Sequence, residues 1–216
     1  MDEEKAWVRQ ALAGDQVAFA RLVDAYKTPV FNLAYRLLGD AAEAEDAAQE
    51  TFVRVYTHLG TYEPDKKFSS WILSITSHYC IDRLRRRRLS WLSLDDLLSR
   101  RTFSDPHEGP ERAALQREEK DAVNDLLAEL PAQYRLVLIL RYWQDLSYQE
   151  MSQVLGTTES AIKSLLHRAR CMLAERMRMR ELQPGASPSP DPGSQSSWPI
   201  SHQKMEAVRN ALPTSD

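Results

Sequence analysis

Cationic and aromatic side chains alternate in the stretch 62–88, a combination suited to binding DNA. Five arginines fall within the six residues 83–88, and lysines and aromatic rings precede them. Cationic groups neutralise phosphates, and aromatic rings stack on unpaired bases at about 1–3 kcal/mol per base. The side chains considered for a displaced strand are Tyr62, Lys66, Lys67, Trp71, His78, Arg83, Arg86 and Arg87. The alternative is a solvated helix end whose cations complement the helix dipole, with the ring of Trp71 mostly in the core.

A second DNA-binding pattern occupies residues 147–176. Ser147 and Glu150 have the spacing of a capping box, which predicts a helix start. Gly156 suits the left-handed position that ends this helix, and one of the two threonines after it caps the next. Two helices joined by a tight turn form a helix-turn-helix, whose second helix enters the major groove. The side chains expected on DNA are Ser160, Lys163, Ser164, His167, Arg168 and Arg170. The alternative is a helical hairpin with a solvated basic face.

Four polar side chains share one face of a helix expected at 41–59. They are Asp46, Gln49, Glu50 and Arg54, opposite Phe52, Val55 and Tyr56. A catalytic carboxylate pair is a poor interpretation, because nothing nearby in the sequence would raise a pKa or complete a site. A solvated face and a protein-docking face remain, and composition does not choose between them. The sequence also has no nucleophile paired with a base, no metal cluster and no glycine-rich phosphate loop. We therefore expect neither an enzyme nor a cofactor or metal.

Apolar residues at helical spacing predict an all-α fold of two small helical domains joined by a flexible linker. The expected helices span about 41–59, 68–88 and 111–130, and a further one begins at Pro131. Pro29 is expected to interrupt the helix that begins before Phe19. The expected divisions are a first domain at 1–88, a linker at 89–110, a second domain at 111–182 and a tail at 183–216. The tail is rich in proline and serine at its start, which predicts disorder.

The distribution of charge supports two separate contacts with nucleic acid. The 216 residues carry a net charge of −3, but 61–92 and 161–182 each carry +4 among acidic stretches. Charges are screened over roughly 8 Å at physiological salt, so a polyanion responds to each basic block more than to the total. Two cysteines cannot form a disulfide framework. The acidic N-terminus and the lack of a long apolar run predict a soluble, cytoplasmic chain without membrane insertion.

Three segments resemble the sigma factors of bacterial RNA polymerase. The run 46–52 looks like the D-x-x-Q-E-x-F element of that family, and 68–75 with the following arginines looks like its next segment. Residues 130–170 look like its C-terminal module. Because only these two modules and a short linker are present, the chain is most similar to the extracytoplasmic-function (ECF) group. The resemblance implies a region 2 helical bundle followed by a region 4 helix-turn-helix.

The resemblance also implies partners and roles. The face bearing Asp46, Gln49 and Glu50 would dock on the clamp helices of the polymerase β′ subunit, and region 4 would meet the β flap. The loop 61–67 and the helix after it would capture unpaired bases of the −10 element. The second helix of the helix-turn-helix would read the −35 element as duplex, and an anti-sigma factor would hold the chain inactive. His78 stands where the family usually has Asn, which predicts an unusual −10 preference. The alternative function is a conventional helix-turn-helix regulator that binds its operator without polymerase.

Overall fold

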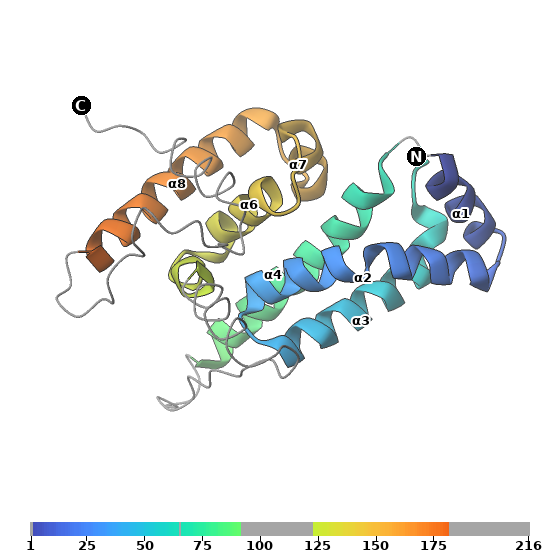
Figure 1. Ribbon diagram of the computed structural model, residues 1–216, viewed down its shortest axis with the longest axis horizontal. Coiled ribbons are helices and arrows are strands. Elements are labelled where there is room, and N and C mark those ends of the chain that lie inside the picture. The colour runs from blue at the N-terminus through green and yellow to red at the C-terminus, as the bar shows by residue number, and fades with distance from the viewer. Residues whose placement is uncertain (1, 65, 92–122, 182–216) are drawn as a thin grey trace, which may run out of the picture.

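A computed structural model describes residues 2–64, 66–91 and 123–181, and Figure 1 shows their arrangement. The helices are α1 (Asp2–Leu12), α2 (Gln16–Leu38), α3 (Ala41–His58), η1 (Leu59–Thr61), α4 (Phe68–Trp91), α6 (Ala132–Tyr142), α7 (Tyr148–Leu155) and α8 (Glu159–Glu181). A further short helical segment spans 123–128. The predicted all-α class is confirmed. The predicted tail, and the predicted linker beyond Trp91, lie outside the described residues.

Local signals fix the ends of α2, but its proline does not interrupt it. Asp15 caps the helix by accepting from the backbone N–H of Val17 at 2.8 Å, and Gly39 ends it with φ 77°. The interruption expected at Pro29 is wrong, because α2 runs through that position. An internal proline costs about 3 kcal/mol. Buried apolar residues on both sides of it, including Leu22 and Leu33, offset that cost by packing.

Helices α2, α3 and α4 pack together as the first module, and α1 lies along α2 (Figure 1). Fully buried side chains at its centre come from α2 and from the start of α4: Leu22, Leu33, Leu37, Phe68 and Ile72. Burying one such side chain contributes about 1.5–3 kcal/mol. The module therefore has its own core, and α3 and α4 also carry polar faces that point away from it.

The second module consists of α6, α7 and α8, with α6 covered from both sides. Five successive residues of α6, Leu136 to Leu140, are buried. A helix that is apolar on all sides must be enclosed. Here α7 and α8 cover one side of α6, while α2 and α4 of the first module lie against the other. Among the described helices, none is long and apolar enough to cross a bilayer.

In the described residues the two modules pack against each other (Figure 1). Helix α7 packs on α4, and α6 packs on α2. Arg135 of α6 donates through Nη1 to the carbonyl of Leu37 at 2.6 Å, and Gln144 donates to the carbonyl of Pro29 at 3.0 Å. Both acceptors belong to α2. These contacts join side chains of the second module to the backbone of the first.

Candidate nucleic-acid and polymerase interfaces

Residues 147–161 have the helix-turn-helix geometry that the sequence predicts. The Ser147 hydroxyl accepts from the Glu150 backbone, and the Glu150 carboxylate accepts from the Ser147 N–H at 2.8 Å, which confirms the capping box. Gly156 ends α7 with φ 61°. Thr158 caps α8 by accepting from the backbone N–H of Ala161 at 3.2 Å. Short-range signals therefore set the angle at which α8 leaves α7.

One face of α8 combines the polar side chains that the sequence singles out. The exposed residues on it are Ser160, Lys163, Ser164, His167 and Arg168. The opposite side is buried through Ile162, Leu166 and Ala169. This face stays exposed although the two modules pack against each other.

Arg170 lies elsewhere, and a tyrosine that the sequence reasoning missed lies behind the face. Arg170 is half-buried and donates through Nε to the Tyr142 hydroxyl at 3.0 Å. Tyr148, at the start of α7, has the Lys163 ammonium 5.8 Å from its ring centroid and the Arg141 guanidinium 5.3 Å from it. A cation near a ring face is held there by the ring quadrupole. The tyrosine thus orients one cation of the exposed face.

The loop before α4 carries the aromatic and basic side chains that the sequence predicts. All three of those considered, Tyr62, Lys66 and Lys67, contact other residues. The Tyr62 ring lies 5.4 Å from that of Phe68 and 5.3 Å from that of Trp71. Lys66 pairs with Glu63 at 3.0 Å. Trp71 is half-buried, which agrees with the alternative that placed it mostly in the core. The loop is therefore ordered against the aromatic end of the first module.

Lys67 and Glu150 form an ion pair between the modules. The Lys67 Nζ lies 2.6 Å from Oε1 of Glu150, and Oε2 of the same carboxylate accepts from the Ser147 N–H. The hydrogen bond from Lys67, followed by those from Ser147, lowers the pKa of Glu150 to about 2. The same hydrogen bond raises the pKa of Lys67. One carboxylate thus serves both the capping box of α7 and a lysine of the loop.

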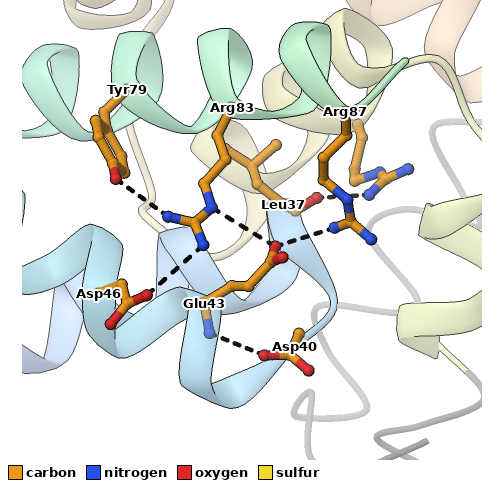
Figure 2. A network of polar contacts seen from close by, with 8 residues as sticks. Leu37, Asp40, Glu43, Asp46, Tyr79, Arg83 and Arg87 are labelled. Atoms are coloured by element: carbon orange, nitrogen blue, oxygen red, sulfur yellow. Dashed lines mark hydrogen bonds and ion pairs between the residues drawn. The ribbon is translucent and has the colours of Figure 1, made fainter. Parts of the chain in front are cut away.

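Two arginines at the end of α4 point at α3 (Figure 2). Arg83 Nη2 lies 3.6 Å from the Asp46 carboxylate, and its Nη1 donates to the Tyr79 hydroxyl at 3.3 Å. Arg87 donates through Nη1 to Glu43 at 3.0 Å. The hydrogen bond with Tyr79, and then the nearby carboxylates, raise the pKa of Arg83. These two guanidinium groups join α4 to α3.

Other cations and polar groups of α4 face solvent. Arg86 and His78 are exposed. The arginine run therefore divides into members that join helices, such as Arg83 and Arg87, and members that remain available for a phosphate.

The outer face of α3 carries both polar and apolar residues. Gln49 is exposed, and Glu50 accepts from the Nε of Arg54 at 2.7 Å. Val53 and Tyr56 are 60% and 58% exposed. Tyr56, which the sequence places on the side opposite the polar residues, is not buried there, and its ring lies 4.9 Å from that of Phe19. The outer face of α3 therefore has an exposed apolar pair beside its polar groups.

The fold and these surfaces define a helix-turn-helix DNA-binding protein with a second, aromatic and basic helical module. Its sequence matches the family model of sigma-70 region 2 over residues 22–90 and that of sigma-70 region 4 over residues 120–173. The chain belongs to the ECF sigma factors of the sigma-70 family, which direct transcription initiation by RNA polymerase and are not enzymes.

Two related sigma factors are similar in sequence over most of the chain. It is 32% identical to the ECF RNA polymerase sigma factor SigW of Bacillus subtilis, over 81% of this chain and 96% of that protein. It is 31% identical to the RNA polymerase sigma-H factor of Pseudomonas aeruginosa, over 78% of this chain and 91% of that protein. These matches include both modules and the stretch between them.

Solved structures share the fold. CnrH, solved in complex with the cytosolic domain of CnrY, matches with a TM-score of 0.64 and 24% identity over 82% of this chain and 99% of that one. The sigma factor RpoE of Bartonella quintana, solved with the anti-sigma factor NepR, gives 0.62 and 20% over 74% and 96%. At this identity the likeness extends to the fold alone.

Proposed function

We propose that this sigma factor divides promoter recognition between its two modules and docks on polymerase through α3. The observation that carries the proposal is the exposed polar face of α8, which combines two cations with hydroxyl and imidazole groups on one side of a recognition helix. Such groups contact base edges and phosphates in a major groove. The domain limits that go with this division are 1–88 and 111–182.

The α8 face is assigned to the −35 element as duplex. Lys163 and Arg168 supply charge, and Ser160, Ser164 and His167 supply further hydrogen-bonding groups. Arg170 is the exception, since its bond to Tyr142 supports a role in positioning the helix.

The loop 61–67 and the start of α4 are assigned to the unpaired −10 strand. The Tyr62 ring, the two loop lysines and exposed His78 supply stacking surface, charge and a hydrogen-bonding group. Arg86 is the exposed arginine for a phosphate, whereas Arg83 and Arg87 support α4 through their bonds to α3.

The α3 face is assigned to the β′ clamp helices of polymerase. Gln49, Glu50 and Asp46 give it polar groups, and exposed Val53 and Tyr56 give it an apolar centre. Region 4 is assigned to the β flap. An anti-sigma factor is a further proposed partner, because one structural neighbour, RpoE of Bartonella quintana, was solved with an anti-sigma factor. The cytoplasm is the compartment that suits these roles.

Run-off transcription tests the function directly. Purified bacterial core polymerase is mixed with fragmented genomic DNA, with and without the full chain. Discrete transcripts that require both components are expected, and their start sites give both promoter elements. Absence of such transcripts, together with tight duplex binding by the chain alone, would contradict the proposal.

Two variants then test the assignments separately. Arg168→Ala should weaken holoenzyme binding to the promoter by about 1–3 kcal/mol if the arginine contacts a base. Arg178→Ala, on the same helix beyond the helix-turn-helix, is the charge-matched control. A double alanine variant at Gln49 and Glu50 should lose co-purification with polymerase, whereas Glu45→Ala on the same helix should not. Equal behaviour of variant and control would count against the corresponding surface.

A further inference from the structure

A histidine and a cysteine lie next to each other on α8, one helical turn apart. The Sγ of Cys171 lies 3.8 Å from Nε2 of His167. His167 is exposed, and Cys171 is half-buried and has a free thiol. Imidazole nitrogen and thiolate sulfur are the two donors that proteins use most for zinc. The pair therefore combines two metal-binding groups at a place that solvent can reach.

The helix beneath this pair is held in place by the core of the second module. Residues four apart on a helix share one face, so the backbone of α8 sets how close the two side chains come. The other side of the helix is buried both before and after the pair, through Ile162, Leu166, Ala169 and Leu173. A ligand that bridges the two side chains therefore needs only small rotations of the side chains and no change in the helix.

The distance between the two donor atoms is close to the span of a bound metal ion. Zn²⁺ binds nitrogen at about 2.0–2.1 Å and sulfur at about 2.3 Å, so two such ligands of a tetrahedral ion lie about 3.5 Å apart. The observed separation exceeds this by only about 0.3 Å. The sequence shows no cluster of metal ligands, and the pair becomes a candidate only through this distance. A sulfur donor excludes Mg²⁺ and Ca²⁺, which take oxygen ligands.

We infer that His167 and Cys171 bind a thiophilic transition metal ion of the class of Zn²⁺. The S–H bond of the thiol breaks as the bond from sulfur to the metal forms, and the proton passes to water. Among the residues that the structure describes, no group of three or more histidine, cysteine, aspartate or glutamate side chains could hold a metal ion. The site is therefore an open one with two protein ligands, and water completes the coordination of the ion.

A metal ion at this site competes with promoter DNA. His167 belongs to the exposed polar face of α8, and its Nε2 cannot contact a base while it holds a metal ion. The hydrated ion also adds volume to a face that must fit into a major groove. Because Lys163 and Arg168 on the same face repel a cation, binding of the ion depends on the negative charge of the Cys171 thiolate. The competition rests on the proposed role of α8 in −35 recognition, whereas the metal site does not.

Titration of the full chain with Co²⁺ tests the site in the absence of DNA. A thiolate bound to Co²⁺ gives a charge-transfer band in the near ultraviolet, and added Zn²⁺ should remove the band by displacing Co²⁺. The band should be present in the unaltered chain and absent in Cys171→Ser. In His167→Gln the metal should bind at least 10- to 100-fold more weakly, roughly the loss that follows removal of a group behind a metal ligand. His58→Gln is the control, because His58 is exposed and has no cysteine one turn away. No band in the unaltered chain, or an equal band in Cys171→Ser, would overturn the site.

Holoenzyme binding to a promoter found by run-off transcription tests the competition. Zn²⁺ that fills the site should weaken binding roughly 5- to 100-fold, the value of a lost base contact. Holoenzyme with Cys171→Ser should bind as tightly as the unaltered one without Zn²⁺ and should keep that affinity when Zn²⁺ is added. Both samples contain the same core polymerase, so any effect of Zn²⁺ on polymerase itself is common to them.

The outcomes separate the metal site from the proposed function. An equal loss of affinity in both holoenzymes would overturn the competition at Cys171. If Zn²⁺ has no effect on the unaltered holoenzyme while Arg168→Ala still weakens binding, the competition is wrong and the −35 assignment stands. If neither Zn²⁺ nor Arg168→Ala has an effect, the −35 assignment of α8 fails, and the cobalt band alone decides whether the metal site exists.

Discussion

Arg135 should stabilise the fold although it places a positive charge inside it. The residue is 8% exposed and donates to the carbonyls of Leu37, Ala128 and Leu130 at 2.6, 2.7 and 3.2 Å. Burial lowers its pKa from 12.5 to about 10, which corresponds to about 3 kcal/mol. Hydrogen bonds from a charged donor contribute about 1.5–3 kcal/mol each. Three of them exceed the cost of burial, by about 1.5–6 kcal/mol.

Arg135→Met should therefore lower the free energy of unfolding by about 2–5 kcal/mol, since methionine fills the volume but donates to none of the three carbonyls. Urea unfolding, followed by circular dichroism, measures the change. Arg36→Met is the control, because Arg36 contributes mainly a guanidinium 5.0 Å from the Trp143 ring centroid, worth about 1 kcal/mol. If Arg135→Met unfolds at the same urea concentration as the unaltered chain or at a higher one, the reasoning is wrong, because the free-energy cost of burying the charge then equals or exceeds the stabilisation by its hydrogen bonds.

Three further predictions concern single residues. Because the folded pKa of Glu150 is about 2, below its ordinary 4.5, its contribution to stability is complete above about pH 4.5 and is lost as pH falls toward 2. In Glu150→Gln the melting temperature should therefore depend less on pH over that range. Gly156→Ala should lower the free energy of unfolding by about 1–2 kcal/mol, as measured by thermal unfolding, because alanine is strained at φ +61°. The added Cβ meets no other atom at either glycine, so Gly60→Ala, at a position without a positive φ, should cost less. Burial raises the pKa of Cys80 to about 12, so a thiol reagent should modify half-buried Cys171 alone until the chain is unfolded; rapid modification of both would contradict the burial.

Features that depend on neighbours in the sequence could be predicted. The capping box at Ser147 and the glycine stop at Gly156 need only a few adjacent residues, and both are found as predicted. The start of α4 at Phe68 likewise follows from apolar spacing after a polar loop. These elements were enough to place the exposed face of α8, because helical spacing alone decides which side chains share a side.

Features that depend on distant partners could not be predicted. Nothing near Lys67 in the sequence indicates that its carboxylate partner lies 83 residues away. The arginine run looked uniform, yet Arg83 and Arg87 meet carboxylates of α3, because only the packing angle of two helices decides which guanidinium groups lie inward. Pro29 misled for the same reason, since propensity is local and the packing that overrides it is not.

The ion pair between Lys67 and Glu150 makes any affinity measured at this lysine a difference between two contacts. A phosphate that takes the lysine must first displace a carboxylate held at 2.6 Å. Alanine at this position would remove the old contact along with the new one, so the change in DNA affinity would understate the strength of the phosphate contact. Added salt weakens both contacts together. A double-mutant cycle of Lys67 and Glu150 therefore separates the phosphate contact of this lysine from its ion pair.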